Sequence, residues 1–325
     1  MNGADPLPSK TRLLDYLRLM RVSNVFTVVA DVSMGFLLVR PGLAPVGVLV
    51  ALIAASILLY SAGMVFNDVF DFPRDRRERP ERPIPSGRIS LKTARRLGVA
   101  LLLAGWIAGW SAGFLPGAVS DWGWRGGVIA TLLVVMILAY NRVLKHTPAG
   151  PLAMGSCRLL NVLLGMSAGV PLTDDANIMG FGAAQLVASA GIGIYVTGIT
   201  WFARSEATTS QRGQLGLAIG TMMLGIGMLG MVHRLLIQQQ GAPLVLLEPY
   251  WWMLLGMLAI PILRRCTIAI SDPKPRQVQL AVRHALWSLI MLDAALVLLV
   301  HQELALAIVA LLIPTAILGK WIAST

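Results

Sequence analysis

The sequence predicts an all-α, polytopic membrane protein built as a bundle of nine or ten transmembrane helices. Of its 325 residues, 56% are hydrophobic and only 13% are charged, and the mean hydropathy is +0.71. Soluble domains carry about 25% charged residues, whereas a membrane-spanning helix needs a run of about 20 apolar residues. Such runs lie at residues 22–39, 45–66, 95–115, 125–141, 149–170, 181–203, 214–236, 249–263, 281–300 and 304–322. The number stays at nine or ten because only His301–Glu303 separates the last two runs and because Pro261 interrupts the run at 249–263.

The basic residues indicate how the chain is oriented. The 27 Lys and Arg residues give a formal net charge of +11, and they gather in alternate loops between the apolar runs. Only Arg40, Arg125 and Arg234 lie near the other ends of the runs, while Arg158 lies inside one. This is the positive-inside pattern, which predicts a cytoplasmic N-terminus. The charge therefore reflects topology and attraction to anionic membrane lipids, and we expect no nucleic-acid partner.

We expect residues 1–325 to form a single membrane domain, because no linker or low-complexity segment divides the chain. Residues 1–21 precede the first apolar run and mix basic with apolar side chains. At helical spacing the apolar ones predict a cytoplasmic amphipathic helix at the membrane surface. They are Leu13, Leu14, Leu17 and Met20.

The segment Asn67–Asp75 follows directly on an apolar run and holds three carboxylates and an amide. On a continuing helix Asp68, Asp71 and Asp75 stand at i, i+3 and i+7, so their oxygens share one face. Oxygen ligands suit Mg²⁺, which proteins commonly hold with one or two carboxylates together with substrate phosphates. Several arginines follow this segment and would suit a phosphate beside such a metal ion.

Polar side chains also lie within the apolar runs. Asn24 and Asp31 share one helical face, Arg158 and Asn161 share another, and Asp293 lies in a third run. Ionisable groups at membrane depth are costly and face a cavity or a partner. Two alternatives stay open for Arg158 and Asn161: they line a substrate pocket, or Arg158 forms an internal ion pair with Asp31.

Two stretches resemble a known family. The segment NDVFDFPRDRRERPERPIPSGRIS, residues 67–90, is similar to the first aspartate-rich motif of the UbiA superfamily of intramembrane prenyltransferases. The similarity covers an NDxxDxxxD core and the Arg-Pro and Pro-Ser-Gly elements that follow. The stretch Tyr140–Gly169, with the run Gly155–Asn161, resembles the EboC-like branch of that superfamily.

The resemblance implies a helical bundle with a central cavity capped by cytoplasmic loops, in the inner membrane of a bacterium. It implies transfer of a polyprenyl group from its diphosphate to an aromatic or other lipophilic acceptor, and it names no protein partner. Residue by residue, it implies that Asn67, Asp68, Asp71 and Asp75 hold Mg²⁺, with Asp68, Asp71 and Lys145 catalytic. Lys145 and either Arg79 or Arg82 would bind the diphosphate, and Arg158, Asn161 and Asn24 would contact substrate.

The chain departs from the family where a second aspartate-rich motif normally follows the sixth span. Residues 201–212 contain one carboxylate, Glu206, between Arg204 and Arg212. Three readings follow: a prenyltransferase in which Glu206 binds metal and the two arginines bind diphosphate, a non-catalytic binder or carrier of isoprenoid lipid, and a transporter. The intact first motif favours the enzyme, since a carrier has little use for three carboxylates beside arginines.

Overall fold

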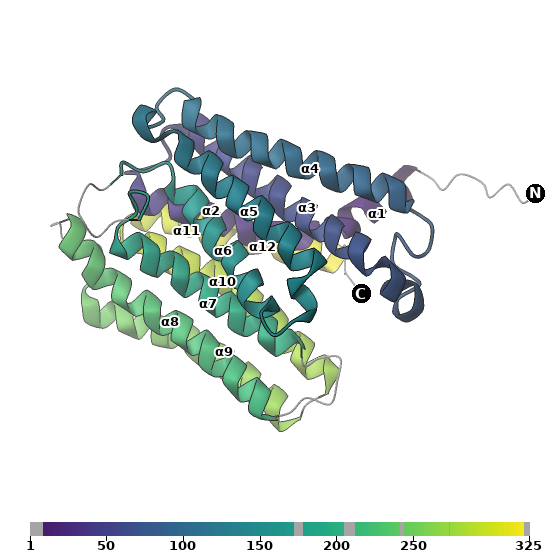
Figure 1. Ribbon diagram of the computed structural model, residues 1–325. Coiled ribbons are helices and arrows are strands. Elements are labelled where there is room, and N and C mark those ends of the chain that lie inside the picture. Colours follow the sequence, from purple (N-terminus) through teal and green to yellow (C-terminus); the bar gives the residue numbers. More distant parts are fainter. Residues whose placement is uncertain (1–8, 172–177, 205–211, 241–243, 273, 322–325) are drawn as a thin grey trace, which may run out of the picture.

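The computed structural model describes residues 9–171, 178–204, 212–240, 244–272 and 274–321. The regular elements of these residues are helices, as predicted (Figure 1). In chain order they are α1 (Ser9–Leu19), η1 (Val22–Asn24), α2 (Val25–Val39), α3 (Val46–Glu78), α4 (Leu91–Ser111), η2 (Ala112–Phe114), η3 (Ser120–Trp122), α5 (Trp124–Arg142), η4 (Leu144–His146), α6 (Gly150–Met166), α7 (Ala183–Arg204), α8 (Arg212–Gln240), α9 (Glu248–Ser271), α10 (Pro275–Leu298), α11 (Gln302–Ala310) and α12 (Leu312–Trp321).

The helices are long and apolar enough for an integral membrane protein. In the described part of the chain, nine meet the length and hydropathy needed to cross a bilayer. The apolar run at 149–170 forms α6, whose 17 residues are fewer than those of any of these nine spans. Pro261 does not end its helix: α9 continues to Ser271, so the interruption expected there is absent. A proline removes one helical hydrogen bond, and its neighbours hold the helix on both sides.

Helix α2 lies at the centre of the bundle and packs against α3, α6 and α10. Its closest neighbour is α6, because glycines let the two backbones touch. A Cβ atom on Gly35 would lie 2.3 Å from the carbonyl oxygen of Val162, and one on Gly165 would lie 2.0 Å from that of Val32. This contact turns the polar faces of α2 and α6 toward one another.

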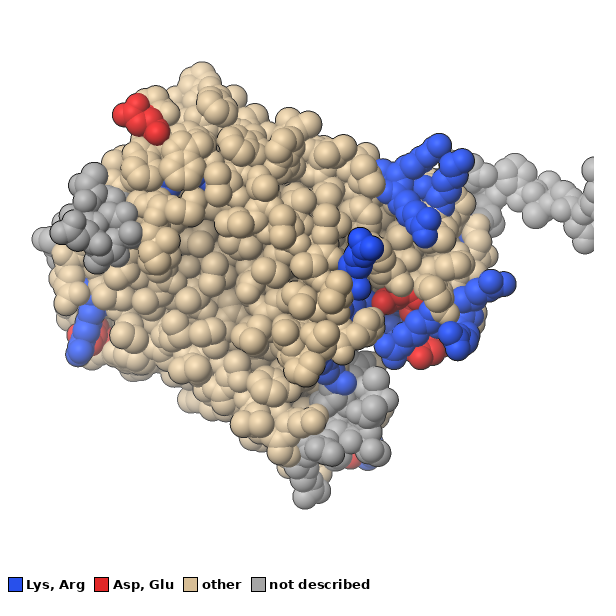
Figure 2. Space-filling model, viewed as in Figure 1, with Lys and Arg blue, Asp and Glu red and all other residues tan. Residues whose placement is uncertain are grey.

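The two ends of the bundle differ in charge. Figure 2 shows Lys and Arg gathered over the end that carries α1 and the last turns of α3, with an uncharged band beside it. We call this the motif end. There the Asp15 carboxylate of α1 lies 3.0 Å from the Arg88 guanidinium, which fastens α1 to the loop after α3. At the opposite end a cavity of about 390 Å³ opens beside Arg40 and His301.

Candidate active site at the motif end

Helix α3 carries the aspartate-rich segment beyond the apolar bundle. Its 33 residues span about 50 Å at 1.5 Å per residue, whereas a bilayer's hydrocarbon core is about 30 Å thick. Asn67–Asp75 therefore forms the protruding turns, and it is helical as predicted. Asp68 and Asp75 are buried, and Asp71 is half-buried. The carboxylates thus lie in polar surroundings that protein atoms partly cover.

The loop at 79–90 folds back over the end of α3. Ile84 and Ile89 are buried in a small apolar cluster with Val65 and Val69 of α3. Gly87 closes the turn with a φ of +79°, a conformation that suits glycine. The Pro-Ser-Gly element therefore has a local structural role, which is to bring the preceding arginine toward the carboxylates.

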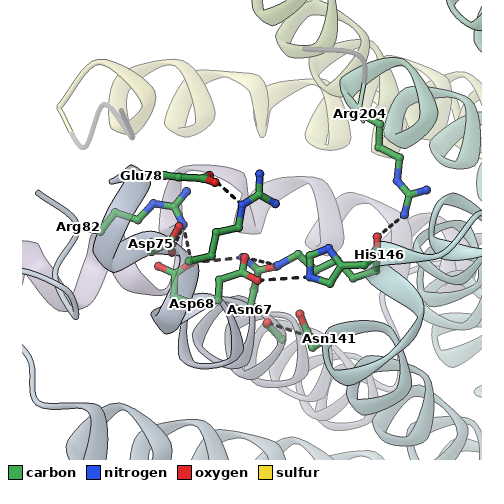
Figure 3. A network of polar contacts seen from close by, with 12 residues as sticks. Asn67, Asp68, Asp75, Glu78, Arg82, Asn141, His146 and Arg204 are labelled. Carbon is green, nitrogen blue, oxygen red and sulfur yellow. Dashed lines mark hydrogen bonds and ion pairs between the residues drawn. The ribbon is translucent and has the colours of Figure 1, made fainter. Parts of the chain in front are cut away.

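Arg82 is the arginine of this loop that lies beside the carboxylates. Its Nη1 atom lies 2.7 Å from Asp75 Oδ2 and 3.4 Å from Asp68 Oδ1 (Figure 3). Arg79, the other candidate for this position, ends α3 with an exposed side chain. Of the two arginines between which the sequence could not choose, Arg82 is the one beside the carboxylates.

Lys145 approaches the same helix face from the loop between α5 and α6. Its ammonium donates a 2.7 Å hydrogen bond to Asn67 Oδ1 and forms an ion pair with Asp71. Asn141, at the end of α5, fixes this approach by donating a 3.2 Å hydrogen bond to the carbonyl of Gly63 in α3. Burial lowers the pKa of Lys145, and the hydrogen bond and charge of Asp71 offset only part of that effect.

Arg21 is a site residue that sequence analysis missed. It joins α1 to η1 with a φ of +48°, which is uncommon for a residue other than glycine. This bend directs the guanidinium into the site, where Nη2 lies 3.7 Å from Asp68 Oδ1. His146 Nε2 also lies 3.9 Å from Asp71 Oδ1. From the sequence, Arg21 belongs to the amphipathic N-terminal segment, and no pattern distinguishes it from its basic neighbours there.

We call this group the motif-end cluster: Arg21, Asn67, Asp68, Asp71, Asp75, Arg82 and Lys145. Arg204 supports it indirectly, since its guanidinium donates to the backbone carbonyls of Lys145 and Thr147, the latter at 2.8 Å. Glu206 lies outside the described residues, and the side chain of Arg212 does too. The predicted metal role of Glu206 and the diphosphate role of Arg212 therefore stay predictions.

Arg158 and Asn161 lie in a second polar group, inside the bundle. Arg158 Nη1 lies 2.7 Å from Asp31 Oδ2, and Asn161 Nδ2 donates to the same oxygen at 3.3 Å. The internal ion pair that the sequence left as one alternative is therefore present, and contact of either residue with substrate stays a prediction. Asn24 adjoins the interior group, since Thr27 Oγ1 donates a 2.8 Å hydrogen bond to its backbone carbonyl. We call this group the interior cluster: Thr27, Asp31, Ser56, Arg158, Asn161 and Asp293.

The motif-end cluster suits a hard divalent cation by the chemistry of its donors. Among the described residues, no three His, Cys, Asp or Glu side chains are grouped closely enough to hold a metal ion alone. Two cationic nitrogens, however, each lie between two oxygen donors of α3. Arg82 Nη1 lies between Asp68 and Asp75, and Lys145 Nζ lies between Asn67 and Asp71. Carboxylate and amide oxygens are the ligands that Mg²⁺ prefers, with substrate phosphates completing its coordination.

The fold and the site define a class: an integral membrane helical bundle with a polar, acid-rich site where its helices leave the bilayer. The model of the UbiA prenyltransferase family matches residues 28–278. The chain belongs to this family. Its likeness to the EboC-like branch stays a prediction.

Relatives and solved structures agree with this assignment. The chain is 36% identical over 91 residues to a digeranylgeranylglyceryl phosphate synthase of Sulfurisphaera tokodaii, covering 28% of this chain and 32% of the relative. The same enzyme of Sulfolobus acidocaldarius is 34% identical over 131 residues, which cover 40% of this chain and 43% of the relative. The chain thus matches less than half the length of these two relatives. A solved UbiA homologue from Archaeoglobus fulgidus, bound to GPP and Mg²⁺, shares the fold with a TM-score of 0.58 at 11% identity, over 91% of this chain and 99% of that one.

Proposed function

We propose that the protein is a Mg²⁺-dependent prenyltransferase, which moves a polyprenyl group from its diphosphate to a lipophilic acceptor. The observation that carries the proposal is the motif-end cluster, in which the acids of α3 meet Arg82, Lys145 and Arg21 at the edge of an apolar bundle. A diphosphate requires cations at one end of the substrate, and a prenyl chain requires an apolar environment at the other. The cluster and the adjoining bundle offer both.

In this proposal Asn67, Asp68, Asp71 and Asp75 hold the metal ion, together with the oxygens of the diphosphate. Bound Mg²⁺ supplies charge neutralisation at the leaving group. Lys145 and Arg82 then exchange part of their contact with the carboxylates for contact with diphosphate oxygens. Arg204 at the end of α7, Arg212 at the start of α8 and Glu206 between them are also proposed to contribute, with Glu206 as a metal ligand and the arginines as diphosphate ligands.

Reaction begins with cleavage of the bond between the first prenyl carbon and the diphosphate oxygen, whose electron pair leaves with the diphosphate. Guanidinium and ammonium groups aimed at that oxygen stabilise the charge that develops there. The allylic carbon then accepts an electron pair from the acceptor, whose proton passes to the released diphosphate. Asp68 and Asp71 orient the leaving group, and the apolar helices keep water from the cation.

The names of the relatives support a choice of acceptor class to test. Those reported above are named for digeranylgeranylglyceryl phosphate, so we propose a glyceryl phosphate lipid as the first acceptor to test and an aromatic lipid as the second. Arg158, Asn161 and Asn24 are proposed to border the substrate from the bundle side.

We infer that residues 1–325 form one domain with its motif end and N-terminus in the cytoplasm. The Lys and Arg residues gathered at that end support this orientation through the positive-inside rule. Residence in a bacterial inner membrane is proposed on the likeness to the EboC-like branch alone. The relatives reported above are archaeal and do not bear on it.

The test is release of inorganic diphosphate by the purified protein in lipid vesicles with Mg²⁺ and geranylgeranyl or farnesyl diphosphate. Each acceptor is supplied separately, and the prenylated product is identified by mass. We expect release that requires Mg²⁺ and is lost in Asp71→Asn. Arg74→Gln is the matched control, since Arg74 lies on the same helix but pairs with exposed Glu78.

One specific observation favours a second function. Arg204, the first basic residue of the degenerate second motif, is engaged with the carbonyls of Lys145 and Thr147. In that position Arg204 stabilises the loop that holds Lys145 instead of binding diphosphate. A non-catalytic binder or carrier of isoprenoid lipid would need neither a second metal ion nor further diphosphate ligands from this motif. Binding of geranylgeranyl diphosphate without release, with both acceptor classes present, would support the carrier and overturn the enzyme.

A further inference from the structure

The interior cluster joins four helices within the membrane-spanning part of the bundle. Asp31 of α2 and Asp293 of α10 are both 0% exposed. Arg158 of α6 pairs with Asp31, while Ser56 of α3 donates a 2.7 Å hydrogen bond to Asn161 Oδ1. The proposed chemistry at the motif end uses neither aspartate.

The donors in this cluster are already engaged. Arg158 contacts Asp31 Oδ2 through Nη1 and Thr27 Oγ1 through Nη2, at 2.7 and 2.9 Å. Asn161 Nδ2 donates to the carbonyl of Val28 at 2.9 Å as well as to Asp31. Three carboxyl oxygens are left without a donor: Asp31 Oδ1 and both oxygens of Asp293. An ionised carboxylate can only accept hydrogen bonds, so the two facing carboxyl groups cannot bond to each other while both are ionised.

The charges are also out of balance. Helix α10 packs against α2, and the charged groups that act electrostatically on Asp293 are Asp31 of α2 and Arg158 of α6. On the other helices packed against α10, Arg265 of α9 acts on His284 and Tyr195 of α7 bonds to the carbonyl of Ala285, both at least two turns before Asp293. Glu248 of α9 pairs with Arg234, and Glu303 of α11 is exposed. Two carboxylates therefore meet one guanidinium. An uncompensated carboxylate is costly within a bilayer, and like charges at close range oppose joint ionisation.

We propose that Asp31 and Asp293 bind one proton between them and form a proton site inside the bundle. Asp31 remains the carboxylate paired with Arg158. Asp293 carries the proton and donates it in a hydrogen bond to Asp31 Oδ1. The proton supplies the missing donor and makes the cluster neutral, so α2, α6 and α10 are joined without a net charge in the membrane. This proposal does not depend on the proposed function, because no substrate or metal takes part.

Infrared spectroscopy of the protein in lipid vesicles tests the proposal directly. A protonated carboxylic acid has a carbonyl stretching band distinct from that of a carboxylate. We expect this band at neutral pH, well above the ordinary aspartate pKa of about 3.9. The band shifts when aspartate is labelled with ¹³C, and it is lost in Asp293→Asn. Asp121→Asn, which alters an exposed aspartate, is the matched control and leaves the band unchanged.

The outcomes decide the proposal even if a variant fails to fold. Absence of the band from the unaltered protein at neutral pH overturns it, as does a band that ¹³C-aspartate does not shift. A band that survives in folded Asp293→Asn belongs to another acid and also overturns it. If the band is absent and Na⁺ raises the melting temperature in a manner that requires Asp293, the ligand is a metal cation rather than a proton.

Thermal unfolding against pH gives a second readout. Loss of the proton at alkaline pH leaves two buried carboxylates beside one guanidinium, so the melting temperature of the unaltered protein should fall as the pH rises through that titration. Asp293→Asn keeps a hydrogen-bond donor and cannot lose it, so its melting temperature should fall less over the same range. Equal alkaline losses in the two proteins would contradict the proposal.

Discussion

The motif-end cluster and the interior cluster use the same kinds of side chain but differ in charge balance: three acids meet three bases at the motif end, and two acids meet one base in the interior. At the motif end, Asp68, Asp71 and Asp75 meet Arg21, Arg82 and Lys145, with side chains between 5% and 34% exposed. In the interior, Asp31 and Asp293 meet Arg158 alone and both acids are fully buried. Separating a largely buried pair leaves a bare charge. At the motif end a bound metal ion and a diphosphate would replace the lost partners, whereas Asp31 in the interior has Arg158 as its cation.

This contrast explains why one cluster suits catalysis and the other suits structure. At the motif end, two cationic nitrogens lie between oxygen donors that a metal ion and a diphosphate could share. In the interior, hydrogen bonds from Arg158, Asn161 and Ser56 fix Asp31 and Asn161. The predictions below separate the two clusters by asking which changes alter stability and which alter ligand binding.

The largest effect on stability is expected at the interior ion pair. Arg158→Leu removes the guanidinium and leaves Asp31 without its cation in an apolar bundle. We expect the free energy of unfolding to fall by about 3–5 kcal/mol, as when one partner of a buried pair is deleted. Reversible unfolding in detergent micelles measures it. A loss below about 1 kcal/mol would mean that the pair is hydrated and that the two clusters do not differ as argued.

The largest effect on ligand binding is expected at the aspartates of α3. Asp68→Ala and Asp71→Ala should each abolish Mg²⁺-dependent binding of a prenyl diphosphate, or weaken turnover by about 10²–10³-fold, while membrane insertion stays intact. Titration calorimetry with and without Mg²⁺ measures the binding. Unchanged affinity in both variants would remove the metal site from α3. Asp121→Ala, in an exposed position, controls for the loss of a carboxylate as such.

The helices and the acidic face of α3 could be predicted from the sequence because both depend on residues that are close together in the chain. Apolar runs long enough for a bilayer become helices, and i, i+3 and i+7 positions share a face on any helix. The partners of those acids depend on how distant segments meet. Arg82 rather than Arg79 faces Asp75 because of the turn at Gly87, and Arg21 reaches Asp68 through a left-handed bend.

The interior cluster was accessible from sequence only as a set of polar residues in apolar runs. Asp31 and Arg158 could be paired as an alternative, since each lies within a span. The sequence could not place Asp293 beside them. Packing across the whole bundle decides which face of α10 meets α2, and no local pattern shows it. An imbalance of two acids and one base becomes apparent only when all three helices are assembled.

Lys145 should give a smaller effect that depends on pH. Removing its ammonium in Lys145→Met deletes one charged contact with the diphosphate, worth about 1.5–3 kcal/mol of affinity. Burial lowers the pKa of Lys145, so it loses its proton, and diphosphate affinity declines, at a lower pH than for an exposed lysine. Lys145→Arg should move that decline to higher pH, because a guanidinium remains charged. Binding measured across an alkaline titration tests this, and identical profiles for lysine and arginine would exclude Lys145 from diphosphate binding.

A single added methyl group at the contact between α2 and α6 should lower the stability of the protein. A Cβ atom in Gly165→Ala would fall 2.0 Å from the carbonyl oxygen of Val32, so the helices must separate. Overpacking of this kind costs about 1–3 kcal/mol. Gly216→Ala on α8 is the matched control, since no atom lies within 4 Å of the added carbon. Melting temperatures of the two variants compare them, and equal values would mean that this contact does not hold the interior cluster together.

The smallest effect on stability is expected at the exposed ion pair of Arg74 and Glu78, which is about as short as the buried pair of Arg158 and Asp31. Arg74 Nε and Glu78 Oε2 are 2.8 Å apart, and their side chains are 55% and 51% exposed. The Arg158–Asp31 pair measures 2.7 Å, with side chains 10% and 0% exposed. Arg74→Gln should therefore cost about 0.5 kcal/mol or less, several-fold below the loss in Arg158→Leu, although the distances match. Similar losses in the two variants would show that distance rather than hydration sets the strength of ion pairs in this bundle.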